Sequence, residues 1–229
     1  CLVWALILIR LVRFAYVWLK ELEYQKRDYI HIFVFWLAVC IVGLLLIYLY
    51  FKNEQSVKVY DFSTYWINVL DARSILTESI TSYLSGMVNT LSLDYNWVPA
   101  FLLMPFSYIF GGSYTVYCQS IFIVYFMPAA FFMTIFALRM TALVKKSAPK
   151  VSVFAVCLVA FSSCPLLLWP LLHGYLDIIG VLIIAILLNY SMHWDGIEFS
   201  FKRNMSMTAI SLILLLSRRW YAYYILGFY

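Results

Sequence analysis

The chain has 229 residues, of which 65% are hydrophobic and 12% are charged, and its formal net charge is +5. A soluble domain is about 45–50% apolar and about 25% charged, so a water-soluble fold of this length is excluded because its interior could not bury so much apolar surface. The cations fall mostly between apolar runs and form no basic stripe with interleaved aromatics, so nucleic acid is not an expected partner. The chain starts at Cys1 and stops inside an apolar run, so we expect residues 1–229 to be a single transmembrane domain from a longer protein.

Apolar runs long enough for membrane-spanning helices recur along the sequence. A span needs about 20 largely apolar residues, which predicts an all-α, polytopic transmembrane bundle. Residues 2–19 contain Arg10 and Arg13, so they form either a span or an amphipathic helix in the interface, and we favour a span. The other expected spans are 29–51, 114–138, 151–168, 175–192 and a last one starting near 205.

The segment 52–98 is the one long polar stretch between these runs. It holds five of the eleven acids together with apolar residues at helical spacing, which predicts short juxtamembrane helices on the membrane surface. Residues 97–110 are apolar but too short to span, which is typical of an interfacial or re-entrant helix. Gly111 and Gly112 end that run with a turn.

The distribution of Lys and Arg orients the chain. Segments 20–28, 139–150 and 193–204 are rich in cations for their length, and such segments lie on the cytoplasmic side of a membrane. The long polar segment and the connection at 169–174 then share the outer face. We therefore expect an integral protein of the plasma membrane whose active site faces outward.

Asp61 stands just past the end of the 29–51 run and is the candidate catalytic base. A carboxylate shielded by headgroups and helices loses hydration, which raises its pKa and improves it as a base. The alternative is that Asp61 caps a helix starting at Phe62. The two roles are compatible.

Three further side chains are candidates for binding an acceptor or a metal. Asp94 ends the polar segment, and it could equally cap the 97–110 helix. His173 and Asp177 flank the second outer connection, and an ionisable residue at a span is by default a functional hypothesis. The three histidines have no metal-ligand spacing, so no zinc site is predicted.

Arg218 and Arg219 lie about 13 residues into the final apolar run, which corresponds to about 20 Å of helix. Two adjacent arginines at that depth are costly unless an anion compensates them, and Arg matches phosphate oxygens bidentately. They are the candidate lipid-phosphate ligands. The alternative is that the helix ends at Leu216 and the arginines meet headgroups.

The layout resembles the GT-C superfamily of membrane glycosyltransferases, especially its protein O-mannosyltransferase and aminoarabinose-transferase branch. The matching parts are Asp61 with the segment 62–92, Asp94-Tyr95-Asn96-Trp97-Val98-Pro99, Phe110-Gly111-Gly112-Ser113 and Gly174-Tyr175-Leu176-Asp177. The resemblance implies a polyprenyl-phosphate-linked sugar donor, Asp61 as the catalytic carboxylate, and a glycan, lipid or protein acceptor. Members with and without a divalent metal exist, so metal use stays open.

Two alternatives to a transferase remain. A transporter or flippase of a lipid-linked saccharide is predicted to show inverted repeats and interrupted helices, and no internal repeat is visible in the sequence. A membrane scaffold without activity would leave the position of Arg218 and Arg219 unexplained. The sequence therefore favours transfer of a sugar from a lipid-phosphate carrier.

Overall fold

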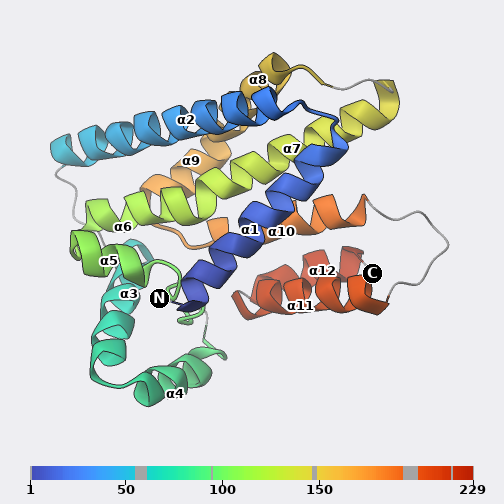
Figure 1. Cartoon of the computed structure of the whole chain (residues 1–229). Coiled ribbons are helices and arrows are strands. Elements are labelled where there is room, and N and C mark those ends of the chain that lie inside the picture. Colours follow the sequence, from blue (N-terminus) through green and yellow to red (C-terminus); the bar gives the residue numbers. More distant parts are fainter. Residues whose placement is uncertain are drawn as a thin grey trace.

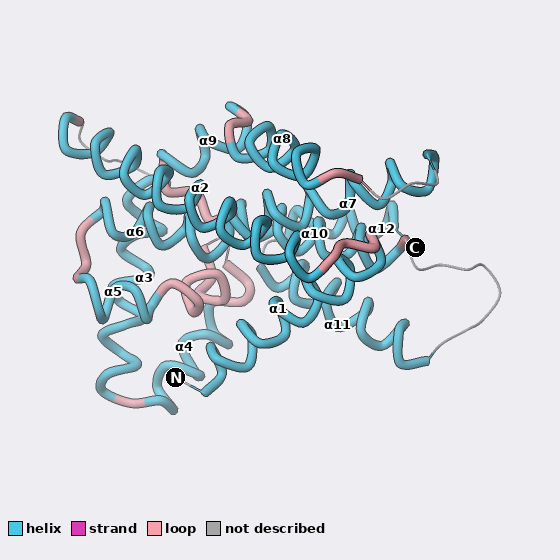
Figure 2. The backbone as a smooth tube through the Cα atoms, turned by 45° about the horizontal axis from the view of Figure 1, so that its top comes forward, coloured by secondary structure: helices cyan, strands magenta, loops and turns pink. Residues whose placement is uncertain are grey.

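The computed structural model describes residues 2–54, 61–93, 95–145, 149–192, 201–217 and 219–228. Within these ranges the regular elements are helices and no strand occurs, so the expected all-α class is confirmed (Figure 2). In chain order the elements are α1 (Leu2–Glu21), α2 (Lys26–Asn53), α3 (Asp61–Glu78), α4 (Ile80–Thr90), α5 (Met104–Phe110), α6 (Tyr114–Ile121), η1 (Phe122–Phe126), α7 (Met127–Lys145), α8 (Val151–Ser162), α9 (Pro165–Leu172), α10 (Ile178–Ser191), α11 (Phe201–Ser217), η2 (Arg219–Tyr221) and α12 (Ala222–Phe228).

Two described helices are long and apolar enough to cross a membrane. One is α2, with 28 residues, and the other is the continuous run of 31 residues from Tyr114 to Val144. The second run contains the π-helical turn η1, which ends two residues before Pro128. A proline lacks the backbone N–H of a regular helix, and a wider turn is one way for the run to continue past it.

The run expected as one span over 151–168 is broken. Helix α8 ends at Ser162, α9 begins at Pro165, and the two helices are bent by 50°. Cys164 is extended, with φ −64° and ψ 117°, because the residue before a proline is disfavoured in the α region. Helix α9 also continues to Leu172, so the connection expected at 169–174 is displaced to residues 173–177. The bent pair adds a third candidate span only if it is counted as one element.

Three other runs that we expected to span form helices outside this group. Helices α10 and α11 have 14 and 17 residues, fewer than the about 20 that a bilayer requires. Helix α1 has 20 residues but carries Arg10, Arg13 and Lys20. Their amphipathic or apolar character is as expected, and their crossing of a membrane stays a prediction.

Helix α7 forms the centre of the molecule. It packs against α1, α8 and α10, and Figure 1 shows it between α2 and α10 with α1 crossing it obliquely. Its buried side chains include Ala130, Ile135 and Leu138, which meet the buried face of α10 in one apolar core. Close packing of these apolar side chains therefore holds the helices together.

The polar segment forms helices, as expected, at the end of the molecule where α6 begins (Figure 1). The helix expected over 97–110 is shorter, because residues 97–103 form turns and α5 starts at Met104. Several hydrogen bonds hold α3 here. Among them, the Trp66 indole N–H donates to the Gly112 carbonyl at 2.9 Å, and Arg73 donates to the Ser107 carbonyl at 2.7 Å. Helix α3 is thus fixed beside α5 and the glycine turn.

Candidate functional site

The predicted site residues are described to different extents. Asp94 and Arg218 lie outside the described residues, and for Asp61 and Arg219 the backbone is described but the side chain is not. Asp61 is itself the first residue of α3, one position earlier than the helix start we expected at Phe62. The side chains of His173 and Asp177 are described in full.

His173 ends α9 and lies against Trp169. Its Nδ1 is 2.8 Å from the Trp169 carbonyl oxygen, and the two rings stack with centroids 4.4 Å apart. Because a carbonyl oxygen only accepts, Nδ1 carries the hydrogen, and in the neutral ring Nε2 is then the acceptor. The histidine is held in one orientation by its own helix.

Asp177 immediately precedes α10 and is half-buried. Its carbonyl oxygen accepts a hydrogen bond from the Tyr221 hydroxyl at 2.6 Å. Tyr221 ends η2, the short helix that starts at Arg219, and its ring lies directly over Gly180. The segment carrying Arg219 is therefore attached to the start of α10.

Helix α3 contacts the same connection through aromatic rings. Tyr65, one helical turn after Asp61, has its ring centroid 6.3 Å from that of Tyr175. The ring of Tyr65 also lies 4.9 Å, centroid to centroid, from Tyr95, the residue after Asp94. The beginning of α3 thus lies between the end of the polar segment and the 173–177 connection.

A buried hydrogen bond is a further contact between these segments. The side-chain amide of Asn96 donates to the Ser217 carbonyl at 3.3 Å, and Ser217 immediately precedes Arg218. Asn96 and Ser217 are both buried, so this contact is shielded from water. It joins the polar segment to the end of α11.

Four segments that are far apart in the sequence therefore meet at one end of the fold. They are residues 61–65, 95–96, 173–177 and 217–221, and each contains or adjoins a residue predicted for the site. Among the residues predicted for the site, the side chains of His173 and Asp177 are described, and the other predicted residues are represented by the neighbours named above.

The connection is shaped by a glycine. Gly174 has φ +68°, a conformation that favours glycine, and its carbonyl accepts the buried Tyr117 hydroxyl at 2.7 Å. A Cβ atom at this position would lie 2.7 Å from the Tyr114 hydroxyl. The sequence motif Gly174-Tyr175-Leu176-Asp177 thus has a backbone reason for its glycine.

Metal binding has no geometric support within the described residues. No group of three or more His, Cys, Asp or Glu side chains gathers there in a way that could hold an ion. His173 and Asp177 share the connection without a third described ligand. The sequence left metal use open, and the described residues do not decide it.

The tyrosines of the site were not predicted. Tyr65, Tyr175 and Tyr221 carry most of the contacts that join the four segments, and Tyr117 joins the 173–177 connection to α6. The 20% aromatic content suggested interfacial belts instead. Tyrosines at irregular spacing give no periodic signal by which these four could have been selected.

A second polar cluster lies at the other end of α1. Arg139 is 6% exposed, and its guanidinium is 2.7 Å from a Glu21 carboxylate oxygen and donates to the Asn189 carbonyl at 2.6 Å. Its Cζ lies 5.8 Å from the ring centroid of Trp18. The sequence predicts that Arg139 belongs to a loop, and this is wrong because α7 continues to Lys145 and Arg139 is buried; the side of the membrane on which it lies stays a prediction. The cluster joins α1, α7 and α10.

No protein family matches this chain, and no curated protein or solved structure shows significant similarity to it.

Proposed function

We propose that this protein is a polytopic plasma-membrane glycosyltransferase of the GT-C kind. It transfers a sugar from a polyprenyl-phosphate carrier to an acceptor hydroxyl on the outer face of the membrane. The observation that supports the proposal is the meeting of residues 61–65, 95–96, 173–177 and 217–221 at one end of the fold.

The proposed reaction is a single inverting displacement. Asp61 takes the proton of the acceptor hydroxyl while that oxygen forms a bond to the anomeric carbon of the donor. The bond from the anomeric carbon to the phosphate oxygen breaks, and its electron pair stays on the phosphate. Arg218 and Arg219 stabilise the negative charge that develops there, since guanidinium groups pair bidentately with phosphate.

The contacts around Tyr221 and Asn96 support this role of the arginines. The hydroxyl of Tyr221 and the amide of Asn96 fix the backbone on both sides of Arg218 and Arg219. The proposal needs pre-organised positive charge beside the leaving group, and anchored backbone on either side of the arginines favours it. Asn96 and Tyr221 are thereby positioning residues.

The test is a transfer assay with the purified protein, a panel of radiolabelled polyprenyl-phosphate sugars and membrane acceptors. Asp61→Asn is expected to lower turnover by roughly 10²–10⁴-fold, the range that a general base contributes. Asp71→Asn is the matched control because Asp71 is an exposed carboxylate on the same helix. Equal turnover by the two variants would remove Asp61 from the mechanism, and absence of turnover with every donor would count against a transferase.

A transporter of a lipid-linked saccharide is the second candidate. The bent pair α8–α9 favours it, because interrupted helices form the substrate sites of many transporters. Proteoliposomes that lack any acceptor separate the two functions. Movement of the intact donor lipid between leaflets, unaffected by Asp61→Asn, would support transport.

A further inference from the structure

The turns at residues 97–103 lie beside the interior of a long helical run and not at its end. The Tyr125 hydroxyl, in η1, donates to the Pro99 carbonyl, and both residues are buried. Tyr125 is eleven residues after Tyr114, which corresponds to about 16 Å of helix. The Tyr114 end of this run is the end that the cation distribution predicts to be outer.

The length of the run places this contact relative to a bilayer. The run has 31 residues and is about 46 Å long, so a hydrocarbon core of about 30 Å centred on it begins about 8 Å below Tyr114. Tyr125 is then about 8 Å inside the outer boundary of the hydrocarbon. A helical side chain points toward the N-terminus of its helix, which here is the outer end. The contact between Tyr125 and Pro99 therefore lies at the outer boundary of the hydrocarbon.

Helix α1 supports the same level by a separate set of contacts. Near its start, the Trp4 indole N–H donates to the Phe101 carbonyl at 3.0 Å, and at its end Glu21 lies 2.7 Å from the Arg139 guanidinium of α7. Glu21 is seventeen residues after Trp4, or about 25 Å of helix. Arg139 is fourteen residues after Tyr125, or about 21 Å of helix. The two helices thus join the same two levels, and Phe101 lies at the outer one.

Helix α4 is fixed at the level of these turns. Tyr83 is 1% exposed, and its ring stacks on those of Trp97 and Phe101 with centroids 6.0 and 6.2 Å away. The Trp97 ring also fills the space beside Gly86, since a Cβ there would lie 2.5 Å from it. Figures 1 and 2 show α4 at the margin of the molecule, near the start of α1. Its outward faces therefore meet the surroundings of the molecule at the outer boundary.

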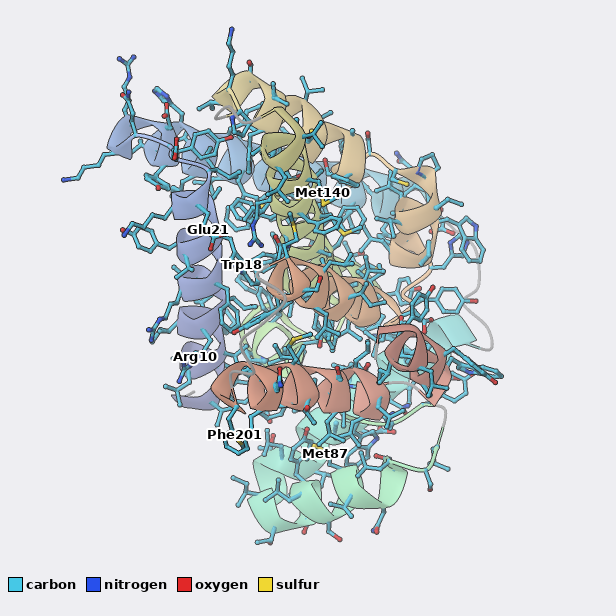
Figure 3. All side chains as sticks on the ribbon, turned by 90° about the vertical axis from the view of Figure 1, so that its right-hand side faces the viewer. Arg10, Trp18, Glu21, Met87, Met140 and Phe201 are labelled. Atoms are coloured by element: carbon cyan, nitrogen blue, oxygen red, sulfur yellow. The ribbon has the colours of Figure 1, made fainter. Side chains whose placement is uncertain are left out.

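One outward face of α4 is apolar. Ile80, Leu84 and Val88 follow one another at intervals of four residues, so they form an apolar stripe along the helix, and they are 65%, 48% and 62% exposed. Figure 3 shows Met87 on the other side of α4, toward the rest of the molecule. Residues 79–93 contain no charged side chain. Water is a poor neighbour for the apolar stripe, and no charge near it opposes contact with hydrocarbon.

A second outward face of α4 is polar but uncharged. Thr81, Ser85 and Asn89 have the same spacing as the apolar stripe, and all three are exposed. A helix with an apolar and a polar face lies in the membrane interface with its apolar face about 5–10 Å into the boundary between headgroups and acyl chains. That depth agrees with the level given by Tyr125 and Pro99.

We propose that α4 lies in the outer interface of the bilayer, with the apolar stripe against acyl chains of the outer leaflet and the polar face toward the headgroups. This distinguishes α4 from α3, whose exposed Asp71 and Glu78 are charged. The inference depends on the run 114–144 crossing the membrane and is independent of sugar transfer. Under the proposed function, α4 would hold Asn96 at the level of the headgroups, where the phosphate of a lipid carrier lies.

A second copy of this chain fits the apolar stripe less well. A stable interface between proteins buries about 800 Å² on each partner. The three exposed side chains of the apolar stripe offer only a fraction of that area, and the polar face beside them adds no charge that could pair with a partner. Acyl chains need no minimum area, because each apolar side chain that enters them leaves water independently.

Depth-dependent fluorescence quenching tests the proposal on the whole chain. The fluorescent amino acid Anap replaces Leu84 (Leu84→Anap), whose exposure lets the probe enter without displacing the core. The protein is reconstituted in phosphatidylcholine vesicles whose acyl chains carry bromine either near the glycerol end or near the methyl end. Bromine near the glycerol end is expected to quench Leu84→Anap more strongly. Ile41→Anap, exposed near the middle of α2, should show the reverse order.

Asn89→Anap, on the polar face of α4, is the matched control, and aqueous iodide should quench it more strongly than either brominated lipid. Equal quenching of Asn89→Anap and Leu84→Anap by bromine would overturn the orientation of the helix. Stronger quenching of Leu84→Anap by bromine near the methyl end would overturn its interfacial depth.

The Ile41 probe separates failure of this proposal from failure of the proposed function. If neither brominated lipid quenches Leu84→Anap while Ile41→Anap is quenched, the apolar stripe does not contact acyl chains and the proposal is overturned. The protein is then still embedded, and the sugar-transfer proposal stands. Absence of quenching at both positions would overturn the interfacial helix and also count against a membrane transferase.

Discussion

The hydroxyl of Tyr221 donates a 2.6 Å hydrogen bond to the backbone carbonyl of Asp177, and its ring occupies the space where a side chain at Gly180 would stand. This pair of residues joins the short helix after α11 to the first turn of α10. Tyr221 is two residues after Arg219 in that short helix. Any proposal for the arginines therefore depends on this glycine as well as on the tyrosine.

Gly180→Ala should displace Tyr221 and with it the segment of Arg219. A Cβ at Gly180 would be 1.9 Å from the Tyr221 Cζ, so the ring must move and its hydrogen bond is lost. We expect a lower melting temperature and a loss of transfer activity, although alanine in a helix is intrinsically favoured over glycine by about 1 kcal/mol.

Gly227→Ala is the matched control because nothing lies within 4 Å of a Cβ at that glycine. It should leave both the melting temperature and the activity unchanged or slightly improved. A Gly180→Ala protein as active and as stable as Gly227→Ala would show that Tyr221 does not position the arginines.

The apolar runs were predictable because hydrophobicity alone defines them. The limits expected at 29–51 and 114–138 differ from the observed helices mainly at their ends. The break before Pro165 was predictable, because the residue before a proline is disfavoured in the α region. The prediction of one span over 151–168 relied on its uniform hydrophobicity instead.

The candidate site could be predicted only as separate residues. Asp61, Asp177 and the arginines stand out as charges next to apolar runs, and that is a local property. Their meeting depends on tertiary contacts such as Tyr65 with Tyr175, which no spacing in the sequence encodes. Arg139 was misassigned for the same reason, because its partners Glu21 and Asn189 come from distant helices.

Glu21→Gln should destabilise the fold by leaving the buried Arg139 guanidinium without its carboxylate. Removing one partner of a fully buried pair costs about 3–5 kcal/mol, and Glu21 keeps 33% of its side chain exposed, so we expect about 2 kcal/mol. Thermal unfolding in detergent measures the change.

The neighbouring Glu23→Gln removes the same charge from an exposed position and should have little effect. The double variant Glu21→Leu with Arg139→Met should recover much of the loss, since an apolar pair replaces the ion pair. A Glu21→Gln protein as stable as Glu23→Gln would show that Asn189 and Trp18 alone satisfy the arginine.

Alkaline pH should loosen the α3–α4 region through Tyr83. Burial raises the pKa of Tyr83 from 10.0 to about 12, so between these values the folded protein keeps the phenol proton that the unfolded chain releases. The contribution is complete below pH 10 and is lost as the pH rises through 12, with a slope of one proton.

Tyr83→Phe should remove this slope while keeping the ring that stacks on Trp97. The pH dependence of thermal unfolding and the ultraviolet absorbance of tyrosinate measure it. Tyr108, an exposed tyrosine of α5, provides the control variant Tyr108→Phe, whose slope should match the wild type. If the stability of Tyr83→Phe depended on pH as that of the wild type does, Tyr83 would have the same pKa in the folded and unfolded states.

Gly174→Ala should disrupt the connection that carries His173 and Asp177, for two separable reasons. At φ +68° an alanine is strained by about 1–2 kcal/mol, and its Cβ would also lie 2.7 Å from the Tyr114 hydroxyl and 2.8 Å from Cε1 of Tyr117. Gly111→Ala introduces backbone strain without a close contact, because Gly111 has φ +93° and nothing lies within 4 Å of a Cβ there.

Removing the Tyr114 hydroxyl then tests the steric part. Gly174→Ala should lower the melting temperature less in a Tyr114→Phe background than in the wild type, because one of the two close contacts has gone. Under the proposed function, transfer activity should follow the same order, while Gly111→Ala should lose stability without a matching loss of activity. If Gly174→Ala proved stable but inactive, the connection would act in the reaction itself rather than by holding the four segments together.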